Sequence, residues 1–237
     1  MTENKRCIFL SHSSKDSKLI GLTQLVFANR EIEPYFAGTR MEGKNPVDKI
    51  VQAITDSIGL FALITPNVVN DTHTRDWVVF EVGVARAKGS TIFCWIDRKV
   101  AEQKSYPKLL KNITDYDKFD CENDEECFRV VNSIRNNAFK LAGISDRKNE
   151  PTRQQLENGL VQMNEAQEIA KKFIMDKKKF DKMEITSVEP NSGLWIIKGT
   201  ISSSSKRSYG SELWTVKIRG KEVIEYSFKP GIAFAIG

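Results

Sequence analysis

The stretch L-F-A-L-I-T-P at residues 60–66 decides how the rest of the sequence is interpreted. The residues from Leu60 to Ile64 are all apolar, so an extended chain here has no polar side facing water. Such a run is typical of a strand buried on both faces, as in a parallel sheet covered by helices on each side. Proline cannot donate to the ladder of a central strand. We therefore predict a buried strand over Leu60–Thr65 that ends before Pro66.

The segments around this strand alternate between short apolar runs and helical patterns. Further strands are predicted at Cys7–Ser11, Pro34–Ala37 and Thr91–Ile96. Helices are predicted at Ser14–Asn29, from Pro46 to Ile58, at Trp77–Lys88 with Gly89 as the cap, and at Asp124–Leu141. This alternation predicts an α/β unit with a parallel sheet covered on both sides.

The second part of the chain has a different pattern. A polar segment at Ser145–Pro151 reads as a linker, and Thr152 with Gln155 forms a capping box for a long helix. Strand patterns follow at Met183–Val188, Leu194–Ile201, Leu213–Ile218 and Glu222–Phe228. They are separated by P-N-S-G at 190–193, a Ser-rich loop at 202–211 and R-G-K at 219–221, where Gly220 predicts a turn. We predict two domains, residues 1–146 and residues 147–237, the second a small α+β unit made of a long helix and an antiparallel meander.

Charge also separates the two parts. Residues 1–146 hold 20 Lys and Arg against 20 Asp and Glu, whereas residues 147–237 hold 16 against 11. The basic stretch from Lys171 to Lys182 includes two phenylalanines and could contact nucleic acid. Those phenylalanines also fit an apolar helix stripe, so we expect a solvated helix face here and no nucleic-acid partner.

Composition and cysteine content bound the class of protein. The chain has 237 residues, of which 40% are hydrophobic and 28% charged, close to the average for globular domains. No apolar run approaches the ~20 residues of a membrane-spanning helix, and the run after Arg6 is too short for a signal peptide. The four cysteines show no C-x-x-C spacing, so we expect neither disulfides nor a metal site. These features predict a soluble, cytoplasmic protein without a membrane partner.

Three polar segments should meet at the carboxyl ends of the parallel strands, where such sheets bind ligands. One is S-H-S-S-K-D at residues 11–16, which offers hydroxyl and backbone N–H groups for an anion. Another is the glycine-bearing segment at residues 38–44. The third is the helix with Trp77 and Glu81, which an i, i+4 spacing places on one helix face.

Glu81 is unusual because it lies in the apolar context W-V-V-F-E-V. A buried carboxylate is unfavourable unless it is paired or used chemically. A surface residue paired with Arg86 or Lys88 is the simple alternative, and a chemical role is the other.

Several of these motifs resemble those of the Toll/interleukin-1 receptor (TIR) domain family. F-L-S-H-S-S-K-D at 9–16, E-G-K at 42–44 and D-W-V-V-F-E at 76–81 agree with that family in order and spacing over roughly residues 5–145. The resemblance implies a flavodoxin-like parallel sheet. In catalytic members, a W-x-x-x-E helix carries the glutamate that cleaves NAD⁺ at the nicotinamide–ribose bond, which corresponds here to Glu81 preceded by Trp77.

The resemblance therefore implies an NAD⁺ glycohydrolase, with NAD⁺ as substrate and no cofactor. The products would be nicotinamide and ADP-ribose, or a cyclic or transferred variant. We expect Glu81 to be catalytic, with substrate-binding residues at Ser11, Ser13, Phe36, Arg40 and Trp77. Each of these has a structural alternative: helix capping for the serines, packing for Phe36 and Trp77, and solvation for Arg40. We expect His12 to make hydrogen bonds rather than act as a base.

Other members of that family imply different functions. Bacterial and archaeal members serve in anti-phage defence, and some animal members are adaptors without activity. The resemblance implies a homo-oligomer formed through TIR–TIR contacts that involve residues 38–44. The alternative function is a non-enzymatic adaptor that would bind other TIR domains through residues 38–46. A secreted effector is a third option, which nothing at the N-terminus supports. In each case the second domain would receive an unidentified trigger or partner.

Overall fold

The computed structural model describes residues 6–28, 31–36, 46–103, 116–145, 151–191, 194–205, 208–230 and 234–235. The chain divides into two compact units, Met1–Arg153 and Gln154–Gly237. The division falls in the first turn of the long helix, whereas the sequence pattern placed the boundary in the preceding polar segment. No helix of the described ranges has the length and apolar character needed to span a bilayer.

The first unit is built on a five-stranded sheet with the order β2-β1-β3-β4-β5. All four neighbouring pairs are parallel, with Phe9 of β1 beside Leu60 of β3 in the register. This is the flavodoxin-like doubly wound order, so the predicted fold class is confirmed. Its strands are β1 (Arg6–Ser11), β2 (Ile32–Phe36), β3 (Leu60–Ile64), β4 (Ile92–Asp97) and β5 (Tyr116–Phe119).

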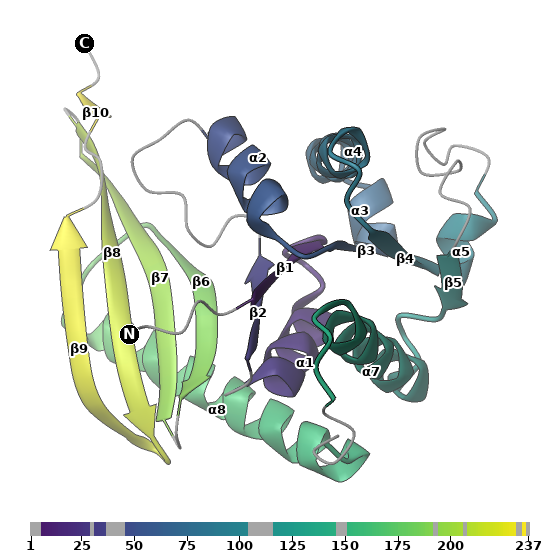
Figure 1. Cartoon of the computed structure of the whole chain (residues 1–237). Helices are drawn as coiled ribbons and strands as arrows, with labels where there is room; N and C mark the ends of the chain where they lie inside the picture. The colour runs from purple at the N-terminus through teal and green to yellow at the C-terminus, as the bar shows by residue number, and fades with distance from the viewer. Residues whose placement is uncertain are drawn as a thin grey trace. The chain divides into compact units, whose positions relative to one another are not determined.

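Helices cover both faces of this sheet (Figure 1). Helices α1 (Ser17–Phe27) and α7 (Asp124–Leu141) pack together on one face. Helices α2 (Pro46–Asp56), α3 (Pro66–Val69) and α4 (Thr72–Ala87) lie on the other, and the short α5 (Arg98–Ala101) follows β4. Every residue of β3 is buried, as the apolar run predicted for a strand covered on both sides.

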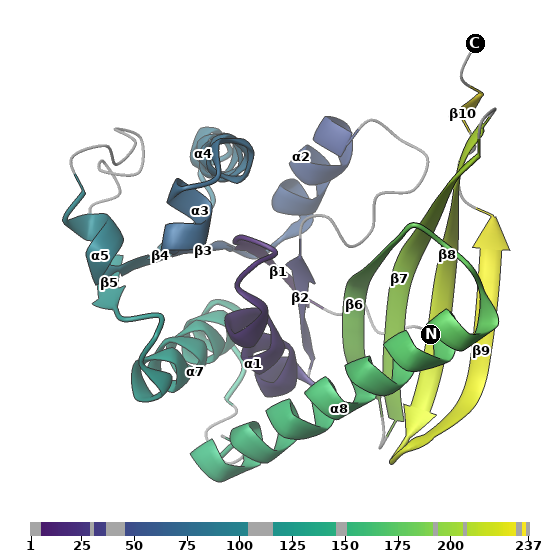
Figure 2. The ribbon, with the colours of Figure 1, turned by 180° about the vertical axis from the view of Figure 1, so that it is seen from behind.

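The second unit joins one long helix, α8 (Arg153–Lys177), to an antiparallel sheet (Figure 2). Its strands are β6 (Lys182–Asn191), β7 (Leu194–Ser205), β8 (Ser208–Arg219), β9 (Glu222–Pro230) and the short β10 (Phe234–Ala235). β7 lies between β6 and β8, and β9 and β10 both pair with β8. The apolar stripe of α8, including Met163 and Ile174, packs with Ile197 and Trp214 of the sheet.

The strands of this unit are longer than the sequence predicts. The described parts of the segments expected as loops at 190–193 and 202–211 are strand: β6 extends to Asn191, β7 extends to Ser205 and β8 begins at Ser208. Serine can occupy an extended strand when it pairs in register, as Ser202 does with Ser211. The turn at Gly220 was predicted correctly, and its φ of 57° is one that glycine adopts without strain.

Candidate functional site

The candidate site begins where β1 ends and α4 crosses above it. Ser11 is the last residue of β1, and its Oγ donates a hydrogen bond to Oε2 of Glu81, which lies 70 positions later in the chain. Ser11 is fully buried, and Glu81 is 3% exposed. β1 and β3 are neighbours where the strand order reverses, which is the ligand-binding position in open α/β sheets.

The position of Glu81 follows from the register of α4. The buried residues of this helix are Val78, Glu81, Val82 and Ala85, a spacing of three to four that faces one side of a helix. Glu81 therefore occupies a core-facing position that an apolar residue would normally fill. The alternative that Glu81 is a surface residue paired with Arg86 or Lys88 is wrong.

Burial alters the ionisation of Glu81. The loss of water around the carboxyl group raises its pKa to about 7, and the hydrogen bond from Ser11 opposes this rise. No ion pair to Glu81 is found among the residues that the structure describes. Near neutral pH, this carboxyl group can therefore be present in both its charged and its neutral form.

Ser13 makes its hydrogen bonds within the turn after β1 rather than to Glu81. Its Oγ accepts a hydrogen bond from the backbone N–H of Lys15 at 3.3 Å, and its carbonyl accepts one from the N–H of Asp16 at 3.0 Å. Helix α1 begins at Ser17 with Asp16 in the N-cap position. The alternative reading of Ser11 and Ser13 as helix caps is therefore wrong, because both serines precede the cap.

Asp16 joins this turn to the end of β3. Its Oδ2 accepts a hydrogen bond from Thr65 Oγ1 at 2.8 Å, and its Oδ1 accepts one from Asn67 Nδ2 at 2.7 Å. Asp16 and Thr65 are both buried. Sequence reasoning missed the roles of Thr65 and Asn67. Their position directly after a buried strand was the signal that could have identified them.

A second connection holds the start of α4. The N-cap residue Asp71 accepts the backbone N–H of Thr74 at 3.1 Å, and Lys15 Nζ lies 3.0 Å from its Oδ2. The Thr74 N–H, together with Lys15, lowers the pKa of Asp71. The turn after β1 thus contacts both the end of β3 and the helix that carries Glu81.

The aromatic residues predicted for the site lie in two places. Phe36 ends β2, is buried, and packs edge-on against His12 with the ring centroids 5.5 Å apart. His12 Nδ1 lies 2.9 Å from the Leu10 carbonyl, and burial lowers the pKa of His12. Because that carbonyl can only accept, Nδ1 is the protonated nitrogen. His12 thus makes a backbone hydrogen bond, as the sequence predicted, and that it does not act as a base stays a prediction.

Trp77 is half-buried on α4 and faces other partners. Its Nε1 donates to His73 Nε2 at 3.1 Å, and its ring packs edge-on against Phe80 at 5.6 Å. Among the described residues, these contacts do not include Glu81. Arg40 and the segment at 38–44 that was assigned to self-association lie outside the described residues.

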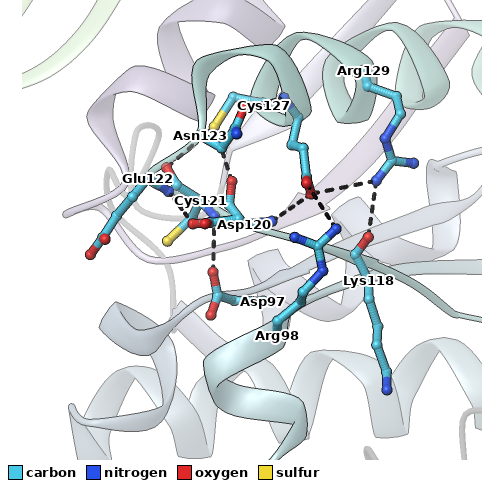
Figure 3. Close-up of polar contacts among 10 residues, drawn as sticks. Asp97, Arg98, Lys118, Asp120, Cys121, Glu122, Asn123, Cys127 and Arg129 are labelled. Carbon is cyan, nitrogen blue, oxygen red and sulfur yellow. Dashed lines mark hydrogen bonds and ion pairs between the residues drawn. The ribbon is translucent and has the colours of Figure 1, made fainter.

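The carboxyl ends of β4 and β5 carry a separate polar cluster that the sequence did not predict (Figure 3). Asp97 is fully buried and accepts the backbone N–H groups of Lys99 at 2.8 Å and Cys121 at 2.9 Å. Glu126 accepts the N–H of Asp120 at 2.8 Å and pairs with Arg98 at 2.8 Å. These carboxylates fix the backbone after β5, which is a structural role.

The chemistry of this cluster supports that assignment. Burial, followed by the contact with Asp97, raises the pKa of Cys121 to about 12. The thiol therefore remains protonated at neutral pH and is a poor nucleophile. Within the described ranges, no group of three or more His, Cys, Asp or Glu residues could hold a metal ion.

The fold and this geometry define a flavodoxin-like α/β unit with a buried, hydrogen-bonded carboxyl group at its switch point. Several solved structures resemble the chain, including the three that follow. A 2-deoxyribosyltransferase from Leishmania mexicana is 14% identical, with a TM-score of 0.37, over 54% of this chain and 97% of that chain. The TIR domains of the activated Roq1 resistosome, which recognises the pathogen effector XopQ, are 14% identical with a TM-score of 0.36, over 71% and 99%. A nucleolar GTP-binding protein from Plasmodium falciparum is 12% identical with a TM-score of 0.36, over 76% and 98%.

No protein-family model matches the sequence, and no curated protein matches it. The three solved structures have different functions, and their TM-scores are all below 0.5. A shared fold does not by itself define a function. The function of this chain therefore has to be argued from its own residues.

Proposed function

We propose that the first unit is an NAD⁺ glycohydrolase of the TIR type in which Glu81 is the catalytic residue. The observation that carries the proposal is the burial of the Glu81 carboxyl group at the switch point of the sheet, bonded to Ser11 and with a pKa near 7. A carboxylate in such low-polarity surroundings acts more strongly on a nearby cation than it would in water.

The chemistry needs one carboxylate rather than two. The nicotinamide of NAD⁺ is already a cationic leaving group, so it departs without being protonated. Its departure leaves positive charge on the ribose ring, which an opposed carboxylate stabilises in the transition state more than in the ground state. Ordinary glycosidases need a second carboxyl group to protonate the leaving oxygen. Water or a hydroxyl group of the substrate would then capture the ribosyl centre.

The Ser11 hydroxyl marks the position where a substrate hydroxyl would bind. In the described structure, Ser11 donates to Glu81 and together with the apolar residues of α4 encloses it. A ribose hydroxyl that replaced Ser11 as the donor would hold the sugar against the carboxylate. The proposal therefore requires the substrate to displace the Ser11 hydroxyl group from Glu81. The cationic nicotinamide would also favour the ionised form of Glu81.

The same enclosure favours a second candidate, a non-enzymatic adaptor. A carboxyl group that is 3% exposed and already hydrogen-bonded can be a purely structural residue. In that case the first unit would act by binding other copies of itself, and Glu81 would only fix α4 against β1. The two candidates differ in what happens to NAD⁺.

The test is incubation of the full chain with NAD⁺ and chromatography for nicotinamide, over a range of protein concentrations. Wild type is expected to release nicotinamide, and Glu81→Gln to lose about two to three orders of magnitude of that activity, as loss of a principal electrostatic stabiliser does. Glu102→Gln, on the exposed surface of the same unit, is the matched control and should keep full activity. Equal release by wild type and Glu81→Gln would show that Glu81 is not the catalytic residue, and no release from wild type at any concentration would favour the adaptor.

Oligomerisation, defence signalling and a trigger at the second unit belong to the same proposal. If neighbouring copies complete the site, nicotinamide release per subunit should rise with protein concentration. A specific activity that is independent of concentration would remove self-association from the proposal but leave the role of Glu81 intact.

A further inference from the structure

The C-terminal end of α8 and the edge strand β9 lie side by side in the second unit (Figure 2). The Phe173 ring of α8 packs edge-on against Tyr226 of β9 with the centroids 4.9 Å apart, and Tyr226 contacts Phe228 at 6.1 Å. The sequence alone shows only the lysines and phenylalanines of α8. The structure adds the aromatic residues of β9 to the same surface.

Two lysines lie over these rings. Lys177 Nζ is 5.5 Å from the Phe173 centroid and 5.9 Å from that of Tyr226, and Lys178 Nζ is 4.4 Å from that of Phe228. Lys178 also pairs with Glu212. Lys177 makes no hydrogen bond or ion pair with another residue in the described ranges, so its three N–H donors are free for a ligand. We call these five residues, Phe173, Lys177, Lys178, Tyr226 and Phe228, the lysine–aromatic surface.

The surface is open. Tyr226 is 48% exposed, and Lys177 beside it is also exposed. Small ligands usually bind in concave sites that enclose most of their area, which does not describe a half-exposed ring at a sheet edge. Aromatic side chains beside lysines on an open surface are instead what proteins use to bind single-stranded nucleic acid without sequence preference.

Charge is consistent with such a ligand. Residues 171–182 hold six lysines against two aspartates. Three of the six, Lys171, Lys178 and Lys182, are paired with Glu168, Glu212 and Glu184. Lys177 forms no such pair in the described ranges and lies beside the exposed ring of Tyr226. A phosphate backbone following the lysines would bring a base over Tyr226. An acidic peptide would satisfy the lysines but leave the ring without a stacking partner.

We propose that the lysine–aromatic surface binds single-stranded nucleic acid, with a base stacked on Tyr226 and a backbone phosphate contacting Lys177. Binding is independent of sequence, because every base has a face that can stack. It weakens as salt increases, because each phosphate contact releases a counterion.

The experiment uses the full chain, fluorescein-labelled oligothymidylate and fluorescence anisotropy at low salt. The expected result is binding of oligothymidylate and about tenfold weaker binding of an abasic strand of equal length, since stacking on a ring contributes roughly that factor or more. Lys177→Glu is expected to weaken binding of both strands. Lys172→Glu makes the same charge change on the exposed face of α8, makes no ring contact, and is expected to have a much smaller effect.

Tyr226 provides the decisive comparison. Tyr226→Leu should remove the preference for oligothymidylate over the abasic strand, whereas Tyr226→Phe keeps the ring and should retain it. Absence of binding by wild type, equal binding of both strands, or equal competition by polyglutamate would overturn the proposal, the last by showing a general polyanion surface. None of these measurements involves NAD⁺, so they are independent of the role of Glu81.

Discussion

Glu81 is expected to make the folded chain less stable as the pH rises. Its pKa in the folded state is about 7, against an ordinary value of 4.5. Between these values the folded chain retains a proton that the unfolded chain has released, so the free energy of unfolding falls with increasing pH. Above 7 the loss is complete and amounts to on the order of 3 kcal/mol.

The substitution Glu81→Gln removes this titration. The variant is expected to be more stable than wild type well above pH 7 and close to it below 4.5, as measured by urea unfolding across this range. Glu102→Gln, on the exposed surface of the first unit, should follow wild type throughout. If Glu81→Gln also followed wild type at every pH, Glu81 would titrate like a surface carboxyl group and its burial would have no electrostatic consequence.

Ser11 is expected to set the pH at which Glu81 ionises. Its hydroxyl group donates to the carboxylate and opposes the pKa rise that burial causes. Ser11→Ala should therefore raise the pKa of Glu81 further, a change that NMR of the carboxyl carbon can follow. If Glu81 acts as a carboxylate in NAD⁺ cleavage, the acid limb of kcat/KM for nicotinamide release should move to higher pH with it.

Ser13→Ala is the matched control for Ser11→Ala. Both serines are buried in the turn region after β1, but Ser13 Oγ bonds to the backbone of Lys15 and not to Glu81. The control is expected to leave the pKa of Glu81 and the acid limb unchanged. Equal shifts in the two variants would point to a rearranged turn rather than to the lost hydroxyl group.

At the scale of elements, Asp16 is expected to couple the turn after β1 to the end of β3. Thr65→Val keeps the shape of the side chain but leaves Asp16 Oδ2 without its donor at 2.8 Å. A buried polar atom without its partner costs about 1–3 kcal/mol, so the free energy of unfolding should fall by this amount. A double-mutant cycle with Asp16→Ala measures the pair, and strictly additive effects would show that the two residues do not interact.

Some elements were predictable from the sequence because they carry strong local patterns. The apolar run of β3 predicted a buried strand, and the apolar stripes predicted the main helices. Gly89 and Gly143 end their helices with positive φ. α3 was missed because it spans Pro66–Val69, too short to show a period. Pro66 starts this helix as well as ending β3, which suits its fixed φ.

Two further elements differ from the prediction because the residues that form them show no apolar pattern. β5 was missed because it is an edge strand in which only Phe119 is buried, so its sequence has no apolar alternation. α4 begins at Thr72, five positions before Trp77, because its first turn is polar and is set by the Asp71 cap. In the site, the apolar neighbours of Glu81 predicted its burial. The contact of Asp16 with Thr65 joins residues 49 positions apart, which no local pattern encodes.

At the scale of the whole molecule, the sequence predicted two units from a polar linker and a change of pattern. It could not predict which side chains of α8 meet which of β9, because that depends on the register of β8 with β9 and on a bulge between Lys217 and Ile218. The pairing of Trp214 with Phe228 follows from this register, and places Phe228 within reach of Lys178. The lysine–aromatic surface is therefore a property of the folded unit.

The two units are expected to lose stability separately, and Gly199 can test this. It lies at the centre of β7, where an added Cβ would lie 2.3 Å from both the Glu184 carbonyl oxygen and Trp214 Cζ2. Neither the backbone of β6 nor a buried indole can move aside easily, so Gly199→Ala should destabilise the second unit by about 1–3 kcal/mol or more. Hydrogen exchange of backbone amides should show lost protection in β6, β7 and β8, and unchanged protection in β1 and β3.

Gly220→Asn, in an open turn at positive φ, is the control and should affect neither unit much. Loss of protection in β3 as large as that in β7 would mean that the chain unfolds as one cooperative body.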